Sequence, residues 1–191
     1  MGKVIVHVSM SLDGFITGPN DRVGEGMGEG GERLHDWMFK DSTPADKEIM
    51  DEWLKNTGAW IMGRHSFEVG VGPWGKNPPF HAPVFVLSHR AHEDLVKEGG
   101  TTYMFVTDGI ESALRKAKKE AGDKQIMLHG ANIFQQYLKS GLIDEINIHI
   151  VPVLFGNGKK LFEQIGEKVE LKKIKTMETP GAVHLTFRVV K

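Results

Sequence analysis

Three short apolar runs, each ending in a turn of small or basic residues, constrain the fold of this sequence most strongly. The runs occupy residues 59–62, 84–87 and 126–128, and the turns that follow read GRHS, SHR and HGAN. The first and third runs pass directly into helix-like segments, an order typical of parallel sheets crossed by helices. These junctions therefore predict an α/β fold.

Further strands and helices are expected on either side of the junctions. Residues 3–10 are rich in β-branched side chains, which favours a buried strand. Helices are expected over about 44–57, 109–121 and 131–140, and GRHSFEV at 63–69 is expected to open a short helix. Asp108 and Glu111 predict a capping box for the second helix. From residue 145 onward, three strand-like segments follow without helices between them, which predicts antiparallel strands.

Together these elements predict a single three-layer α/β domain over residues 1–191. Its sheet is expected to be mixed and mostly parallel, with helices on both faces and antiparallel C-terminal strands. A chain of 191 residues is long enough for one domain with a sizeable core. Residues 13–42 interrupt the pattern with a long structureless loop, and a loop of that length is usually functional or disordered.

Composition excludes several classes of function. The net charge of -1 provides no basic surface for nucleic acid or an anionic membrane. The absence of cysteine removes disulfides, thiolate metal sites and cysteine nucleophiles. His89 and His92 are close in sequence but lack a nearby third ligand, so no metal is expected. Neither a signal peptide nor a membrane-spanning segment is evident, and a cytoplasmic protein is expected.

The glycine-rich stretch GEGMGEGGE at 24–32 matches the G-x-G-x-x-G pattern of dinucleotide-binding loops but not its context. That fingerprint requires a strand before the first glycine and a helix after the third, whereas the turn-like GPNDRV precedes this stretch. Its three glutamates would also repel a pyrophosphate. A second near match, GVGPWGKN at 70–77, lacks the serine or threonine of a phosphate loop and is followed by two prolines. We interpret the first stretch as a mobile lid and the second as a turn.

The three strand-end junctions carry residues suited to binding phosphate. In α/β sheets, ligands bind beyond the carboxyl ends of the strands, so the three turns are expected to line one edge. Small residues allow close approach to the backbone, and helix N-termini offer free N–H groups to phosphate. Arg64 and Arg90 have serines nearby and add an anion pocket capable of bidentate contact. This chemistry suits the ribose phosphate of NADP, whereas an NAD site would favour an acidic residue.

Five motifs resemble, in their order, the dihydrofolate-reductase-like superfamily over nearly the whole chain. They are SLDGFITGPN, WIMGRHSFE, VFVLSHR, IMLHGANIFQQYL and LIDEINIHIVPVLFGNGKKLF. The sequence is most similar to stand-alone relatives of the reductase half of the bifunctional riboflavin-biosynthesis deaminase/reductase, the RibD C-terminal domain family. The resemblance implies a dihydrofolate-reductase-like fold and an NADPH-dependent reductase. Riboflavin-type reductases commonly pair, so a homodimer is expected, with no nucleic-acid or membrane partner.

The resemblance also implies which residues meet NADPH. Its phosphate and pyrophosphate contacts fall on the three junctions, and its nicotinamide end lies at the first strand and the loop after it. The implied cofactor-binding residues are Gly63, Arg64, His65 and Ser66, then Leu87, Ser88 and Arg90, then Gly130, Ala131, Asn132, Ile133 and Phe134, together with Val8, Ile16 and Thr17.

The catalytic and substrate-binding residues are assigned by position in the chain. By analogy with dihydrofolate reductases, Asp36 is the candidate acid that anchors the substrate and assists protonation. Asp41 and a helix-cap role for Asp36 stay as alternatives. Trp37 and Phe39 are expected to form apolar walls of the substrate site. Asp13 is also assigned to substrate binding, although a turn-forming Asp-Gly pair explains it equally well.

The expected reaction is hydride transfer from NADPH to a carbon–nitrogen or carbonyl-type double bond of a small heterocyclic or sugar-derived substrate. The riboflavin branch implies reduction of 5-amino-6-(5-phosphoribosylamino)uracil. Lys159 and Lys160 are then either ligands of the substrate phosphate or ordinary surface lysines. A fused zinc deaminase is excluded because its signature requires cysteine. Dihydrofolate reductase and a non-catalytic NADP-binding module are the alternative functions.

Overall fold

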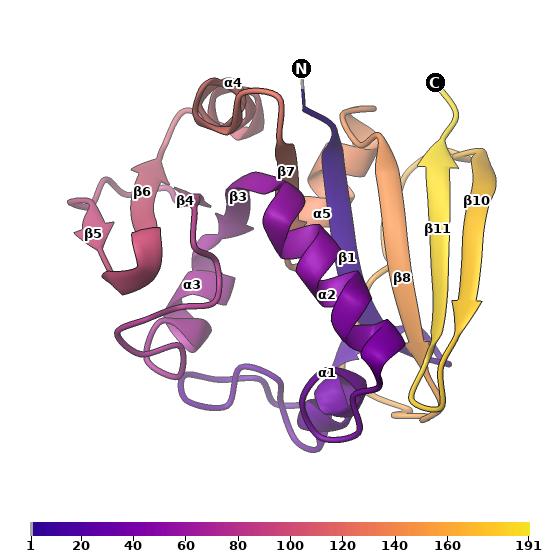
Figure 1. Ribbon diagram of the computed structural model, residues 1–191. Coiled ribbons are helices and arrows are strands. Elements are labelled where there is room, and N and C mark those ends of the chain that lie inside the picture. Colours follow the sequence, from indigo (N-terminus) through magenta and orange to yellow (C-terminus); the bar gives the residue numbers. More distant parts are fainter. Residues whose placement is uncertain (1) are drawn as a thin grey trace.

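A computed structural model describes residues 2–191 and arranges them around one nine-stranded sheet (Figure 1). The strand order is β10-β11-β8-β1-β7-β3-β4-β6-β5, and β2 and β9 form a separate two-stranded sheet. The strands are β1 (Val4–Ser11), β2 (Phe15–Thr17), β3 (Thr57–Gly63), β4 (Pro83–Leu87), β5 (Leu95–Val96), β6 (Thr102–Val106), β7 (Gln125–His129), β8 (Glu145–Val151), β9 (Lys159–Lys160), β10 (Leu171–Glu178) and β11 (Val183–Val189). The helices are α1 (Asp36–Phe39), α2 (Pro44–Asn56), α3 (Arg64–Gly70), α4 (Ile110–Ala121) and α5 (Ala131–Lys139), with short 3-10 turns η1 (Gly31–His35) and η2 (Glu98–Gly100).

The middle of the sheet is parallel and its two ends are antiparallel. Strands β8, β1, β7, β3, β4 and β6 pair in parallel in that order. At one end β11 and β10 add antiparallel strands, and at the other end β5 pairs antiparallel with β6. The predicted α/β fold class, with its mostly parallel sheet and antiparallel C-terminal strands, is confirmed.

Helices cover both faces of the sheet, as the period-two pattern of its strands requires. Along β7, Ile126 and Leu128 join a core cluster that includes residues of α4 and α5. Met127, between them in sequence, joins the opposite cluster, against which Trp53 of α2 and Phe67 of α3 pack. The sheet therefore lies between two helical layers.

The predicted starts of α2 and α4 agree with the structure, but the capping box predicted for α4 is wrong. Thr43 caps α2 in a capping box with Asp46, and Pro44 occupies the first turn. At α4 the N-cap residue is Gly109, without a side-chain cap bond. Asp108 instead accepts a 2.7 Å hydrogen bond from the Ser112 hydroxyl, so its carboxylate is engaged with a side chain and does not cap the backbone.

The segment 13–42 is more regular than predicted. It contains β2, η1 and α1, and an isolated β-bridge joins Arg22 to Glu25. The glycine stretch 24–32 folds back on the turn before it, with Gly18 N donating to Met27 O at 2.8 Å and Glu29 N to Pro19 O at 2.8 Å. The mobility of this stretch stays a prediction. Within residues 2–191, no helix is long and apolar enough to cross a membrane.

Candidate functional site

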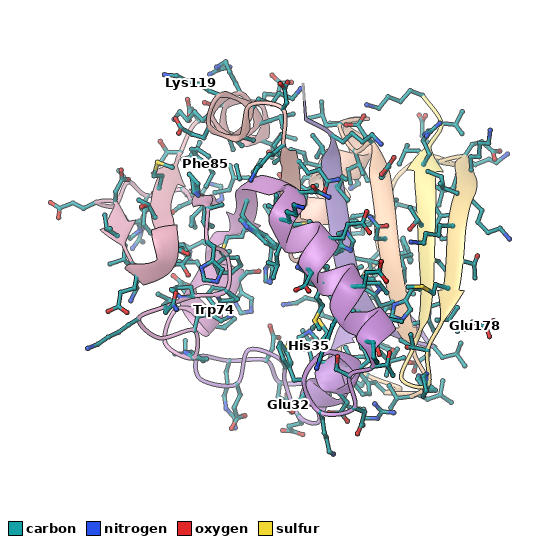
Figure 2. All side chains as sticks on the ribbon, in the orientation of Figure 1. Glu32, His35, Trp74, Phe85, Lys119 and Glu178 are labelled. Carbon is teal, nitrogen blue, oxygen red and sulfur yellow. The ribbon has the colours of Figure 1, made fainter. Side chains whose placement is uncertain are left out.

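The carboxyl ends of β3, β4 and β7 lie in one row and bring the three predicted junctions together. In the sheet register, Gly63 at the end of β3 pairs with Leu87 at the end of β4. Met62, one residue earlier, pairs with His129 at the end of β7. Figure 2 shows His35 and Trp74 at this end of the molecule, opposite Lys119 of α4. We call this row of strand ends, with the turns that follow them, the carboxyl edge.

At the carboxyl edge, the start of α3 packs directly against the start of α5. A Cβ atom on Gly130 would lie 2.6 Å from Ser66 Oγ, and the φ angle of Gly130 is +93°, which disfavours any other residue. On the neighbouring strand, a Cβ on Gly63 would lie 3.5 Å from Ile133. The backbone conformation therefore favours glycine at Gly130, and any other residue would also displace the Ser66 hydroxyl.

The first turn of α5 leaves backbone donors free at this point. Gly130 is the N-cap and provides no side-chain cap bond. The first helical bond runs from Phe134 N to Gly130 O, so the preceding amides of the helix have no intrahelical acceptor. Free N–H groups at the positive end of a helix are suited to an anion.

The two predicted arginines flank the edge with their charged groups accessible. Arg64 is about half exposed and its Nε lies 3.3 Å from Glu68 Oε1, one turn along α3. Arg90 is exposed and donates its backbone N–H to Ser88 Oγ at 3.1 Å, while Ser88 itself is buried. The two guanidinium groups can therefore reach an anion in the solvent beyond the strand ends.

Asp21, which the sequence analysis did not single out, joins the loop before the glycine stretch to the carboxyl edge. Its Oδ2 lies 2.6 Å from His65 Nε2 and 2.7 Å from Lys159 Nζ. Burial raises the pKa of Asp21, but the hydrogen bonds and charges of Lys159 and His65 outweigh it and hold the pKa below its usual value. Sequence alone offered no signal for Asp21, because its partners are far away in the chain.

Several residues assigned to the cofactor belong to the hydrophobic core or to the loop framework. Ala131, Ile133, Phe134 and Ile16 are buried in the cluster under α4 and α5, and Val8 packs against it. Contact between Ile133 or Phe134 and a cofactor would therefore use backbone atoms. Thr17 is also buried, and its Oγ1 accepts from Lys159 N at 3.3 Å. Asn132 is exposed on the first turn of α5.

Asp13 serves as a joint between two loops. Its carboxylate accepts from the Ser11 hydroxyl at 2.6 Å and from the backbone N–H groups of Phe155 and Gly156 at 3.2 and 2.7 Å. The Ser11 bond contributes most to lowering the pKa of Asp13 to about 2. These contacts favour the turn-forming interpretation over the substrate-binding one.

The structure contradicts the assignment of Trp37 as a wall of the substrate site. Its side chain is fully buried, donates from Nε1 to Ser9 Oγ at 3.0 Å, and lies against His149 and His184 with ring centroids 4.7 and 4.9 Å away. A ring enclosed in this way cannot contact a ligand. By contrast, Phe39 is 79% exposed and accessible to one.

The candidate acid Asp36 is the first residue of α1 and is partly exposed. Its carboxylate lies 3.4 Å from Arg33 Nη1, and the N-cap of α1 is His35. Asp36 therefore does not cap this helix. Asp41, the other candidate, is exposed and bonds to the same turn through its backbone N–H.

His129, at the end of β7, is a candidate site residue that the sequence analysis missed. Its Nδ1 is buried and has no hydrogen-bond partner within residues 2–191, and the rings of Trp74 and Phe80 lie about 6 Å away. Burial, with a smaller contribution from the charge of His35, lowers the pKa of His129 to about 4. The sequence signal that could have identified His129 was its position directly before the glycine of a strand–helix turn.

Acid should destabilise the protein partly through His129. The pKa of His129 is about 4 in the folded state, against 6.5 for the ordinary side chain. The unfolded chain therefore binds the proton between these values, and the free energy of unfolding falls as the pH decreases. We expect this residue alone to remove about 1.5 kcal/mol between pH 6.5 and pH 5. Urea denaturation at both pH values measures this decrease in the free energy of unfolding. The decrease should be smaller for His129→Leu than for the wild type, whereas the exposed control His89→Gln should show the wild-type decrease. An unchanged pH dependence in His129→Leu would contradict the prediction.

Comparison with known proteins supports the similarity seen in the motifs. The sequence matches the RibD C-terminal domain family over residues 2–185. The Bacillus subtilis (strain 168) protein YyaP, which is named as uncharacterized, is 26% identical over 196 residues that span 97% of this chain and 94% of YyaP.

Solved structures share the fold at low sequence identity. A protein from Shewanella sp. PV-4, named for riboflavin biosynthesis, aligns with a TM-score of 0.77 and 23% identity over 100% of both chains. Dihydrofolate reductase from Enterococcus faecalis, solved with NADP(H), aligns with a TM-score of 0.61 and 18% identity over 100% of this chain and 98% of that one. The match to the family over residues 2–185 decides the assignment, and the chain belongs to the RibD C-terminal domain family.

Proposed function

We propose that the protein is an NADPH-dependent reductase whose cofactor lies along the carboxyl edge. The observation that carries the proposal is the contact between Ser66 and Gly130, which sets the free amides of α5 beside the GRHS turn. A side chain at Gly130 would fill this cradle, so the residues present fit a pyrophosphate. Membership of a reductase family and the likeness to an NADP(H)-bound fold support the same cofactor.

Each part of the edge then has a distinct task. The amides of α5 hold the pyrophosphate, and the guanidinium groups of Arg64 and Arg90 bind the ribose phosphate that distinguishes NADPH from NADH. NADPH supplies the hydride when it is bound. The segment from Asp21 through the glycine stretch covers the edge and excludes water, and Asp36 or the partly buried His129 relays the proton.

The substrate we propose is a small heterocyclic or sugar-derived compound of riboflavin biosynthesis, with 5-amino-6-(5-phosphoribosylamino)uracil as the specific candidate. The RibD family and the riboflavin-related name of the Shewanella protein support this choice. Stopped-flow loss of NADPH absorbance should occur with this compound and not with dihydrofolate. Turnover of dihydrofolate with inhibition by methotrexate would identify a dihydrofolate reductase instead. Absence of turnover across pyrimidine, pterin and carbonyl substrates would identify a nucleotide-binding module.

We expect Arg64→Ala and Arg90→Ala each to weaken NADPH binding about tenfold and to leave NADH binding nearly unchanged. The reason is that each guanidinium loses a charge-assisted hydrogen bond to the phosphate that only NADPH carries. Isothermal titration with both nucleotides measures the ratio directly. Arg188→Ala on β11 is the matched control, because Arg188 is exposed and far from the carboxyl edge. Equal losses of affinity for NADPH and NADH, or an unchanged preference for NADPH, would show that these arginines do not bind the ribose phosphate.

We also propose that the protein acts in the cytoplasm as a homodimer without nucleic-acid or membrane partners. Pairing is what the resemblance to riboflavin-type reductases implies, and β10 leaves an edge of the sheet available to a second copy. Light scattering on the eluting protein should give twice the mass of one chain.

A further inference from the structure

A cavity of about 190 Å³ lies on the α2 side of the sheet, toward the amino ends of the strands. Its lining runs from Gln125 and Glu145, the first residues of β7 and β8, along β8 to His149, and includes no residue of the carboxyl edge. Figure 1 shows α2 crossing in front of β1, while no helix lies in front of β8, β11 and β10. The cavity is lined with polar groups where a sheet face under a helix is normally apolar. They include His7, Asn147, His149, His184 and Thr186.

The three histidines form a chain of contacts that begins at a buried carboxylate. Asp46 is fully buried and accepts from the backbone N–H and the hydroxyl of Thr43 at 2.8 and 2.6 Å. His184 Nε2 lies 3.3 Å from Asp46 Oδ1, and His184 Nδ1 lies 2.9 Å from His149 Nδ1. His149 Nε2 in turn lies 3.4 Å from His7 Nδ1. The chain therefore runs from α2 through β11 and β8 to β1.

The groups around His184 Nε2 indicate which nitrogen of each ring carries the hydrogen. Burial lowers the pKa of all three histidines, so each ring is neutral at pH 7 and has one N–H. His184 Nε2 also lies 3.1 Å from Thr179 Oγ1, and the Thr179 hydroxyl donates to Ala182 O at 3.3 Å. With that hydroxyl donating elsewhere, both neighbours of His184 Nε2, the Thr179 oxygen and the ionised Asp46 carboxylate, are acceptors, so we place the hydrogen on Nε2 and the acceptor on Nδ1. His149 must then donate from Nδ1 and accept at Nε2, and His7 donates from Nδ1. The chain ends at an acceptor, His7 Nε2, for which residues 2–191 provide no partner.

Hydrogen-bond donors lie beside this acceptor. Asn147 pairs with His7 in the register of β1 and β8 and is 8% exposed. Its Oδ1 accepts from the Thr186 hydroxyl at 2.7 Å, which leaves its amide N–H groups unpaired in the described part of the chain. The indole N–H of Trp53 is likewise buried without a partner there, and its ring meets the His7 ring edge-on at 4.8 Å. An acceptor, donors and an aromatic wall thus converge on one small cavity.

We propose that this cavity is a second binding site, for a neutral ring that carries an N–H next to a C=O. The ring N–H donates to His7 Nε2, and the carbonyl accepts from the Asn147 amide. Neutral histidines offer no charge to an anion or a cation. The charged side chains at the lining are Glu52, Glu145 and Lys175, and Glu145 is already paired with Lys3 at 2.6 Å. The volume suits about one such ring. The proposal does not depend on the NADPH site, because none of the residues assigned to the cofactor lines the cavity.

The test uses 2-pyridone, the simplest ring with this N–H and C=O pair, and N-methyl-2-pyridone, which lacks the N–H. Amide NMR spectra of the full chain are followed during titration with each compound. We expect 2-pyridone to shift resonances of β1 and β8 around His7 and Asn147, and N-methyl-2-pyridone to bind at least about tenfold more weakly. His7→Phe, which keeps a ring but removes the acceptor, should lose a similar factor, and Glu120→Gln on α4 should bind as the wild type.

The comparison of the two compounds on the wild-type protein needs no variant, so the proposal stays testable if His7→Phe fails to fold. Equal binding of both compounds would overturn it, because binding would not use the N–H. Shifts confined to the carboxyl edge, or no shifts with 2-pyridone at tens of millimolar, would also overturn it. A failure of NADPH binding would have no bearing on this result, since the two sites share no residue.

Discussion

Trp37→Ala should reduce the free energy of unfolding by about 3 to 5 kcal/mol, the range for removing a large buried aromatic side chain. Trp37 is fully buried, and its indole N–H donates to Ser9 Oγ. Its ring also lies against two of the buried histidines, so truncation leaves a cavity beside polar groups that are costly to expose. Gly181 packs so close to it that a Cβ there would lie 2.7 Å from the Trp37 Cβ, which leaves little room for the backbone to collapse inward.

Phe39→Ala is the matched control, two residues later in the same short helix. Phe39 is 79% exposed, so we expect its truncation to change stability by less than about 0.5 kcal/mol. Urea denaturation of the two variants and the wild type measures both effects. A small loss for Trp37→Ala, or equal losses for the two variants, would mean that the aromatic ring is not a core residue. Substrate affinity measured for Phe39→Ala tests separately whether the exposed ring forms a wall of the site.

Trp37 also shows where prediction from this sequence fails. A tryptophan next to the candidate acid is compatible both with a ligand wall and with a core residue, and local sequence does not distinguish them. The outcome depends on Ser9, His149 and His184, which reach Trp37 only after β1, β8 and β11 have paired. Asp21 was missed for the same reason, because its partners His65 and Lys159 are close to it only in the folded chain.

Features set by local chemistry were predicted well. The start of α2 at Pro44 was predicted, whereas its capping box of Thr43 with Asp46 was not. The strand–turn–helix junctions rest on short apolar runs followed by small residues. Asp108 is the exception among the caps, because Ser112, four residues later, engages its carboxylate. The short elements within 13–42 escaped prediction since glycine is compatible with turns, bridges and loops alike.

Gly130→Ala should weaken NADPH binding by about 100-fold if the cofactor lies along the carboxyl edge. The new Cβ would lie 2.6 Å from Ser66 Oγ, and an alanine at φ +93° is strained by about 1 to 3 kcal/mol. The Ser66 hydroxyl must turn away, and relief of the backbone strain at residue 130 shifts the first turn of α5, which displaces the amides that we assign to the pyrophosphate. A shift of this kind removes several charge-assisted hydrogen bonds at once, and a 100-fold loss corresponds to about 2.7 kcal/mol.

Gly141→Ala separates this effect from general strain, because Gly141 also has a positive φ, +65°, but follows the other end of α5 and has nothing within 4 Å of its Cβ position. Both variants should lose stability, because alanine is strained at a positive φ. Only Gly130→Ala should lose NADPH affinity in isothermal titration at a temperature where both are folded. If Gly130→Ala binds NADPH with wild-type affinity, the pyrophosphate does not bind at this turn. If Gly141→Ala loses as much affinity as Gly130→Ala, the loss comes from strain in α5 as a whole.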